Sequence, residues 1–462
     1  MELRVLAPDA ATGQNQHCWE CRRRRLVCDA TRPVCKKCQD SKIVCPGYDE
    51  KQPLRWLKPG RVTCRTRKSK AGGGGSRKDA AESGEGSDVN HVYQSVSPLH
   101  KIAQKYEEKP FPMSLLHYFP ESQRHGFVSI AMAHRLYRLP EGTSKEFEQK
   151  ARSITYQYRG MAIRALNQEI GSEATAVSNA LIASTITLLA ADLQLSSASV
   201  WRFHFDGVVA MIKLAPDVFE YERVLRQGKN LTISYRLEGF GNTTSPRWNQ
   251  STAVTEPDIA DMVFEIYGDR VLPLYVGTLC PRPLFMNVLT INYLRRGGVD
   301  PTAVADPSDL LEDINDFAPA DWVEGKATPD TRPQWLLLGC IYQSAVALYC
   351  IMSLQSVGLL PSTLETVALD ASHYERLMQL LRRGLAYPHL RHSVTWPLVV
   401  AGIRAASGSR QDRHYVIREL SESARVGGTA LPLQAKEVLE RYWASGSTNW
   451  DDCFDRPYVW AA

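Results

Sequence analysis

Residues 18–45 have the sequence CWECRRRRLVCDATRPVCKKCQDSKIVC, which holds six of the chain's eleven cysteines. The gaps between the cysteines are two, six, six, two and six residues, and the stretch contains no histidine. Each half therefore repeats the pattern Cys-x2-Cys-x6-Cys. Two cysteines separated by two residues can turn back onto one metal ion, and thiolates are soft ligands that suit zinc. The pattern predicts a structural zinc site.

The number of cysteines indicates two metal ions with shared ligands. A structural zinc takes four ligands in a tetrahedron, so six thiolates fill two sites only if two of them bridge both ions. The alternatives are a chance spacing or a redox cluster of reduced thiols. The N-terminal stretch MELRVLAPDA lacks an apolar run, so we expect no secretory signal, and clustered cysteines then favour metal over disulfides. A segment this short has little core, so metal binding must supply its folding energy.

This spacing resembles the fungal zinc binuclear cluster (Zn2Cys6) family of transcription factors. The resemblance covers Cys18–Cys45 and implies two Zn²⁺ as cofactors. In that family the first and fourth cysteines bridge the metals, which implies bridging by Cys18 and Cys35. The other four cysteines would complete one zinc site each in pairs, Cys21 with Cys28 and Cys38 with Cys45. Pro33 matches the loop proline that turns the family's chain between the two halves.

Charge is concentrated at the N-terminal end of the chain. Residues 1–78 carry 19 Lys and Arg against 7 Asp and Glu, whereas the remainder carries 36 against 43. This asymmetry predicts a polyanion partner for the N-terminal part only, and we expect that partner to be double-stranded DNA. The run Arg22–Arg25 is alternatively a solvated face or a nuclear-import signal, and we expect a nuclear location.

An arginine can donate two hydrogen bonds to guanine in the major groove. The family places a basic residue late in the first inter-cysteine stretch against a CGG-like triplet, which implies base contact by Arg24 or Arg25. The other basic residues of the cluster are expected to contact phosphates, namely Arg22, Arg23, Lys36, Lys37 and Lys42.

Composition divides the rest of the chain. We predict a disordered lead at 1–16, the zinc module at 17–48, a basic and then flexible linker at 49–97, and an all-helical regulatory domain at 98–462. Pro46–Tyr48 and Pro53–Trp56 resemble the extension that follows the cluster in some family members, although a plain charged linker is the alternative. No heptad lies between Cys45 and Pro110, which leaves both a homodimer and a monomer open.

Apolar residues at three- and four-residue spacing predict helices in the C-terminal region. The predicted helices are Phe147–Ile170, Glu173–Leu195, Val200–Leu214, Ile259–Arg270, Leu284–Leu294, Gln334–Leu354, Leu364–Leu381, Val394–Ala406, Arg413–Ala424 and Gln434–Ala444. Segment 227–252 is polar and is predicted to be a loop with at most a short strand or hairpin. Trp335–Leu354 is apolar enough to span a bilayer, but interrupting polar residues favour a buried core helix, so we expect no membrane partner.

The helical region is similar to the regulatory domain that accompanies zinc clusters in fungal regulators. The similarity lies in Trp201–Gly207, Trp396–Gly402 and Trp450–Tyr458, and it implies a region that responds to an effector or a coregulator. For single residues of this region we prefer a structural role over a catalytic or ligand-binding one. His204 is expected to be a satisfied core or surface histidine, Asp451 and Asp452 solvated capping residues, and Cys340 and Cys350 core thiols.

The sequence therefore predicts a zinc-dependent, sequence-specific transcription regulator, of the RNA polymerase II type. It shows no nucleophile–base motif and no catalytic metal pattern with an open coordination position, so we expect no enzyme. The first alternative is a helical ligand-binding protein or enzyme that uses the zinc module as a targeting device. The second is a zinc-stabilised protein–protein adaptor, against which the four-arginine run argues.

Overall fold

The computed structural model divides the chain into two compact units, Met1–Arg77 and Lys78–Ala462. Within them it describes residues 17–24, 26–31, 34–41, 43, 45, 113–140, 142–171, 178–195, 201–214, 233–252, 280–297, 306–324 and 327–460. Among the described residues every regular element is a helix, which agrees with the predicted fold class. The first unit holds two short helices, α1 (Trp19–Arg24) and α2 (Lys36–Asp40).

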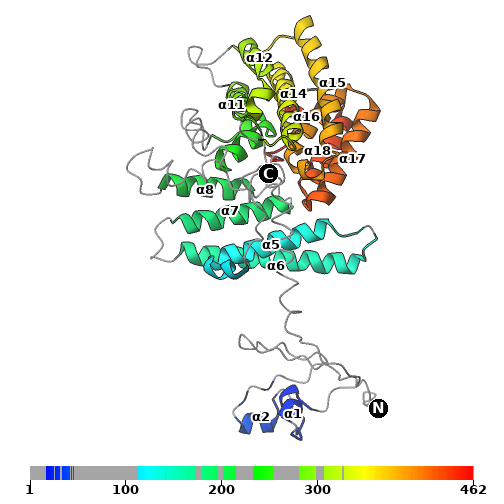
Figure 1. Cartoon of the computed structure of the whole chain (residues 1–462). Coiled ribbons are helices and arrows are strands. Elements are labelled where there is room, and N and C mark those ends of the chain that lie inside the picture. Colours follow the sequence, from blue (N-terminus) through cyan, green and yellow to red (C-terminus); the bar gives the residue numbers. More distant parts are fainter. Residues whose placement is uncertain are drawn as a thin grey trace, which may run out of the picture. The chain divides into compact units, whose positions relative to one another are not determined.

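The second unit begins with a stack of helices that follow one another along the chain (Figure 1). After the 3-10 turn η1 (Met113–Tyr118), these are α5 (Glu121–Tyr137), α6 (Lys145–Ile170), α7 (Asn179–Gln194) and α8 (Trp201–Leu214). Two of them begin at serine caps, where the side chains of Ser144 and Ser178 accept backbone N–H groups of the first turn.

A buried carboxylate ties three of these helices together. Asp192 of α7 has no solvent exposure, and it accepts from Arg159 of α6 while His204 Nε2 of α8 lies 2.9 Å from its Oδ2. Burial opposes ionisation of Asp192, but the contacts with His204 and Arg159 outweigh burial and lower its pKa. His204 is thus paired with a buried carboxylate of the helical core, in keeping with the structural role expected of it.

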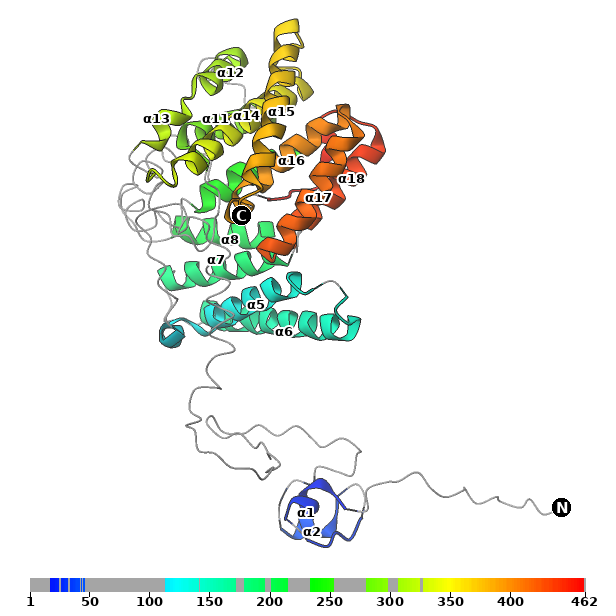
Figure 2. The same cartoon turned by 45° about the vertical axis from the view of Figure 1, so that its right-hand side comes forward.

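The C-terminal part packs around one apolar helix, α14 (Arg332–Ser356), as Figure 2 shows from the side. Its neighbours are α11 (Arg282–Arg296), α12 (Pro307–Asp316), α13 (Pro319–Val323), α15 (Leu364–Gly384) and α16 (Thr395–Arg404), and α16 in turn packs on α17 (Arg410–Gly427) and α18 (Leu431–Ser445). α14 is the one described helix long and apolar enough to cross a bilayer, yet 83% of its most apolar window is buried in the protein. The prediction of a core helix for Trp335–Leu354 is confirmed.

Short 3-10 turns connect the later helices. They are η2 (Arg247–Asn249), η3 (Pro388–Leu390), η4 (His392–Val394), η5 (Ala405–Ser407) and η6 (Asp451–Cys453). The predicted helices of the second unit match α6, α8, α11, α14, α15, α16, α17 and α18 to within a few residues at each end. The helix predicted from Glu173 begins at Asn179 in the described chain, and Ile259–Arg270 lies outside the described residues.

The prediction for segment 227–252 is wrong over its central part, because residues 233–243 form a helix. From 233 to 246 every side chain except that of Arg236 is buried. The polar residues at the end of the segment are satisfied internally. Thr243 and Ser245 donate to main-chain carbonyls one turn back, and Asn242 makes two bonds with the Ser251 main chain. The segment is polar because its hydroxyl and amide groups bond to backbone, not because it meets water.

This buried helix is the meeting point of the three segments that the sequence singled out. Phe240 packs edge-on against Trp396, with ring centroids 5.0 Å apart. The indole of Trp450 donates to Thr243 O at 3.0 Å, and Tyr458 exchanges two hydrogen bonds with Thr244. At Gly241 an added Cβ would lie 3.0 Å from the ring of Trp201, so the backbone and the indole are in close contact. Tryptophans distant in sequence thus share one core.

A buried arginine closes the end of helix 233–243. Arg295 of α11 is fully buried and donates to the carbonyls of Asn242 and Ser245, which a helix C-terminus leaves without partners. Its charge is balanced by Asp451, whose Oδ1 lies 2.6 Å from Nη2. Asp451 also accepts from the Arg247 N–H and the Ser356 hydroxyl. The expectation of a solvated Asp451 is therefore wrong, whereas Asp452 is exposed and accepts only from Ser447 among the described residues.

The neighbouring carboxylates Asp451 and Asp452 provide a matched test of this arrangement. Asp451→Asn should lower the free energy of unfolding by about 3 kcal/mol, because it leaves the buried Arg295 charge without its counter-ion. Asp452→Asn should change it by no more than about 0.5 kcal/mol. Urea denaturation of the two variants measures both values, and equal effects would show that Arg295 does not depend on Asp451.

Candidate metal centre

The two halves of the cysteine module have the same local geometry, offset by 17 residues. Cys18 Sγ accepts from the backbone N–H of Cys21, and Cys35 Sγ accepts from that of Cys38, both at 3.4 Å. Further along each half, Leu26 N donates to Cys21 O and Ile43 N donates to Cys38 O. Each half is thus a cysteine-capped helix followed by a turn that brings its third cysteine back.

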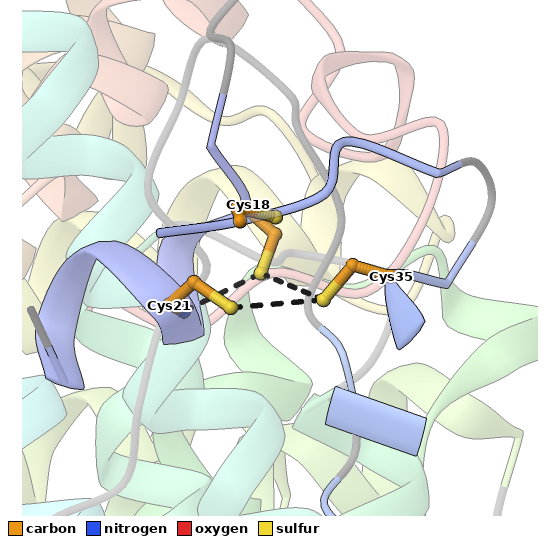
Figure 3. A group of neighbouring side chains, drawn as sticks. Cys18, Cys21 and Cys35 are labelled. Carbon is orange, nitrogen blue, oxygen red and sulfur yellow. Dashed lines mark hydrogen bonds between the residues drawn. The ribbon is translucent and has the colours of Figure 1, made fainter. Parts of the chain in front are cut away.

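Sulfur atoms from both halves converge on one point (Figure 3). Cys18 Sγ lies 3.6 Å from Cys35 Sγ and 3.8 Å from Cys38 Sγ, and Cys21 Sγ lies 3.7 Å from Cys35 Sγ. All six cysteines are free of disulfides. Four thiolates bonded to zinc at ~2.3 Å stand at tetrahedron corners about 3.8 Å apart. The observed separations therefore match the spacing that a shared zinc site requires.

The sulfurs form two sets of four, and the sets overlap. One set is Cys18, Cys21, Cys28 and Cys35, and the other is Cys18, Cys35, Cys38 and Cys45, with all ligand atoms of a set within 4.8 Å of one another. Cys18 and Cys35 belong to both sets. No other group of His, Cys, Asp or Glu with this geometry occurs among the described residues.

Among the residues of the module whose side chains are described, the buried apolar ones are all cysteines. Five of the six cysteines are buried, whereas Leu26, Val27 and Ile43 are exposed, Val27 to 79%. Burial raises the pKa of the Cys21 and Cys38 thiols, and neighbouring thiols raise it further. A divalent cation reverses this balance because it stabilises the thiolates directly. The donor set fits zinc, which would supply both charge compensation and folding energy.

The loop between the halves is organised by a residue that the sequence analysis missed. Asp29 accepts from the Thr31 hydroxyl and from the backbone N–H groups of Lys36 and Lys37 at the start of α2. The bond with Thr31, followed by that with Lys36 N–H, lowers the pKa of the Asp29 carboxyl. The sequence signal was present, because aspartate is a preferred helix N-terminal partner, but Asp29 is seven residues before the N–H that it caps.

The structure places several predicted DNA-contacting residues on the module's surface. Arg22 and Arg24 in α1, and Lys36 and Lys37 in α2, are all exposed. Arg23 is part of α1, but its side chain is not described. Arg25, Lys42 and the loop proline Pro33 lie outside the described residues.

Both units of the chain match models of known protein families. The model of the fungal Zn(2)-Cys(6) binuclear cluster domain matches residues 16–55, and that of the fungal specific transcription factor domain matches 89–237 and 298–461. The chain is 30% identical over 482 residues to the phomenoic acid biosynthesis cluster-specific transcriptional regulator of Leptosphaeria maculans, covering 99% of this chain and 91% of that protein. It is 50% identical over 42 residues to arginine metabolism regulation protein II of Saccharomyces cerevisiae, covering 9% of this chain and 4% of that protein. No solved structure matches the chain significantly.

A cysteine substitution tests the metal centre. Cys28→Ala removes a sulfur from one set only. We expect the zinc content of the purified full chain to fall below two ions. DNA binding should also be lost, because the module unfolds. Cys340→Ala, a half-buried cysteine of α14 outside both sets, is the control and should keep two zincs. Elemental analysis gives the count, and two zincs retained in Cys28→Ala would exclude Cys28 as a ligand.

Proposed function

Because the chain belongs to the fungal transcription factors that join a Zn(2)-Cys(6) binuclear cluster to a fungal specific helical domain, we propose a definite division of labour within its DNA-binding module. The protein is a DNA-binding transcription regulator, and its cluster domain binds two zinc ions. In our proposal the α1 half contacts bases, and the remaining basic side chains contact phosphates.

The proposed zinc ligands are the six clustered cysteines, with Cys18 and Cys35 as the bridging pair. The overlap of the two sulfur sets supports this assignment, since each set offers four sulfurs and these two residues are common to both. Cys21 and Cys28 then complete one site, and Cys38 and Cys45 the other. This overlap is the observation on which the proposed function chiefly rests, because zinc ions that share two sulfurs would hold α1 and α2 about one centre.

The two halves of the module share one backbone geometry but differ in charge, and this difference is informative. The 17-residue offset that relates the two halves aligns Arg22–Arg25 with Gln39–Lys42. One half therefore carries four arginines where the other carries Gln, Asp, Ser and Lys. A duplex contacted by both halves alike would not need this difference. We infer that the α1 half enters the major groove, where Arg24 or Arg25 donates to the O6 and N7 of guanine in a CGG-like triplet.

Lys36 and Lys37 are proposed to contact phosphate through their ammonium groups alone. A helix N-terminus often binds phosphate with its free N–H groups, but the Asp29 carboxylate already accepts those of Lys36 and Lys37. Their exposed side chains remain available for the DNA backbone. Such contacts position the module without selecting sequence, as we propose also for Arg22, Arg23 and Lys42.

The wider role follows from the whole-chain relative. We propose that the protein acts in the nucleus, that it activates or represses the genes of a biosynthetic cluster, and that it is not an enzyme. The full-length similarity to a regulator named for one biosynthesis cluster supports this role. The helical domain would respond to an effector or coregulator, and a homodimer with paired sites remains a further proposal.

Selection of bound sequences from random duplexes by the zinc-loaded full chain tests base recognition. We expect enrichment of CGG-like triplets, and enrichment of no sequence would contradict the proposal. Arg25→Ala should relax the preference at one position by ~1–3 kcal/mol while the zinc content stays at two ions.

Lys37→Ala is the matched comparison for a phosphate contact. It should weaken binding to all duplexes alike and reduce the slope of log K against log salt by ~0.9. Titrations of the same duplexes at several salt concentrations measure both effects. If Arg25→Ala shows this uniform loss instead, the base contact is assigned to the wrong residue.

A further inference from the structure

A cavity of about 860 Å³ opens on the helical unit, beside α17. Its lining comes from the end of α15, the connection that follows it, and α17. The α17 residues are spaced three and four apart, so they share one helical face. The lining residues are Arg382, Leu385, Ala386, Arg391, Gln411, His414, Tyr415, Arg418 and Glu419.

The lining has an excess of positive charge. Three arginines face one carboxylate, and that carboxylate, Glu419, is shared, with Oε1 2.7 Å from Arg418 Nη2 and Oε2 3.1 Å from Arg391 Nη2. The third arginine, Arg382, reaches Asp412 only at 3.7 Å, which is longer than a hydrogen bond. Each guanidinium has five N–H donors, so the three groups offer more donors than these carboxylates accept.

A buried hydroxyl gives a second, independent observation. The Tyr415 OH is shielded from solvent and has no hydrogen-bond partner among the described residues. Burial, together with the nearby Glu419 charge, raises the pKa of Tyr415 to about 12, so the group stays a neutral donor. The guanidinium carbons of Arg382 and Arg418 each lie 5.3 Å from the centroid of its ring. The hydroxyl of Tyr415 thus adds an unpartnered donor to guanidinium groups that already offer more N–H donors than the neighbouring carboxylates accept.

We propose that this cavity binds a small organic polyanion, a metabolite bearing phosphate or carboxylate groups, through Arg382, Arg391, Arg418 and the Tyr415 hydroxyl. Planar guanidinium groups suit the paired oxygens of both anions. The volume is in the ~300–1,000 Å³ range of small-molecule sites and exceeds what a single inorganic ion fills. Leu385 and Ala386 offer apolar contact for the organic part of the molecule. This inference specifies the effector of the proposed regulatory domain, and its biological meaning rests on that function.

Isothermal titration of the full chain with citrate and with pyrophosphate, at constant ionic strength, tests the site. We expect saturable binding of at least one probe, and the stronger binder distinguishes a carboxylate from a phosphate ligand. Arg418→Gln should weaken that binding about tenfold or more. Tyr415→Phe should weaken it severalfold, because it removes only the hydroxyl.

Arg425→Gln is the matched control, since Arg425 is an exposed arginine on the same helix, paired with Glu422 and outside the cavity. It should bind as the unchanged protein does, and thermal melts should show all variants folded. Absence of saturable binding by both probes, or equal weakening in Arg418→Gln and Arg425→Gln, would overturn the proposal. The titration contains no DNA, so its failure is separate from a failure of CGG-like selection, which is measured on the same preparations.

Discussion

The coordination of thiolates to zinc is the constraint on which the DNA-binding module depends. Where its side chains are described, the buried ones are cysteines, and the aliphatic residues Leu26, Val27 and Ile43 are exposed. These exposed aliphatic residues do not hold α1 against α2, so bonds between the cysteines and metal are the interaction that joins the two helices. Nearly every other described position of the module lies at the surface. A module of this kind can carry four consecutive arginines without a cost to its core.

The helical unit differs from the module because it has a large apolar core in which polar groups are also buried. Hydrophobic periodicity does not predict which polar groups these are. Helix 233–243 ends inside the protein, and its last carbonyls would be costly to bury without partners. Arg295 supplies donors, and Asp451 supplies the compensating charge. The buried tryptophans Trp396 and Trp450 then pack on, and bond to, the helix that Arg295 closes. One charged pair thus allows the chain's C-terminal segment to enter the core.

Sequence periodicity predicted the helices whose polarity follows their exposure, such as α15 and α17, where one face is apolar and the other charged. Periodicity failed to predict the structure where polar residues bond to other groups inside the protein instead of to water. The polar composition of 227–252 favours a loop, yet residues 233–243 are a buried helix in which Asn242 and Thr243 bond to main-chain groups. Asp451 is expected to be a solvated capping residue, and the sequence gives no sign of its partner Arg295, which is 156 residues away along the chain. The clustering of the six cysteines was predictable because they are close in sequence and regularly spaced.

The cavity beside α17 is another feature that the sequence pattern did not predict. Its arginines at 382, 391 and 418 form no motif, and only the packing of α15 and the following connection against α17 brings them together. α17 also extends beyond the cavity to α5, where Gly428, its left-handed C-cap, lies so close to His134 that an added Cβ would be 2.4 Å from the imidazole. Gln194 of α7 donates to Gly428 O at 2.8 Å. The same helix therefore lines the proposed anion site near its start and contacts α5 at its end. α5 is the first α-helix described after the cysteine module.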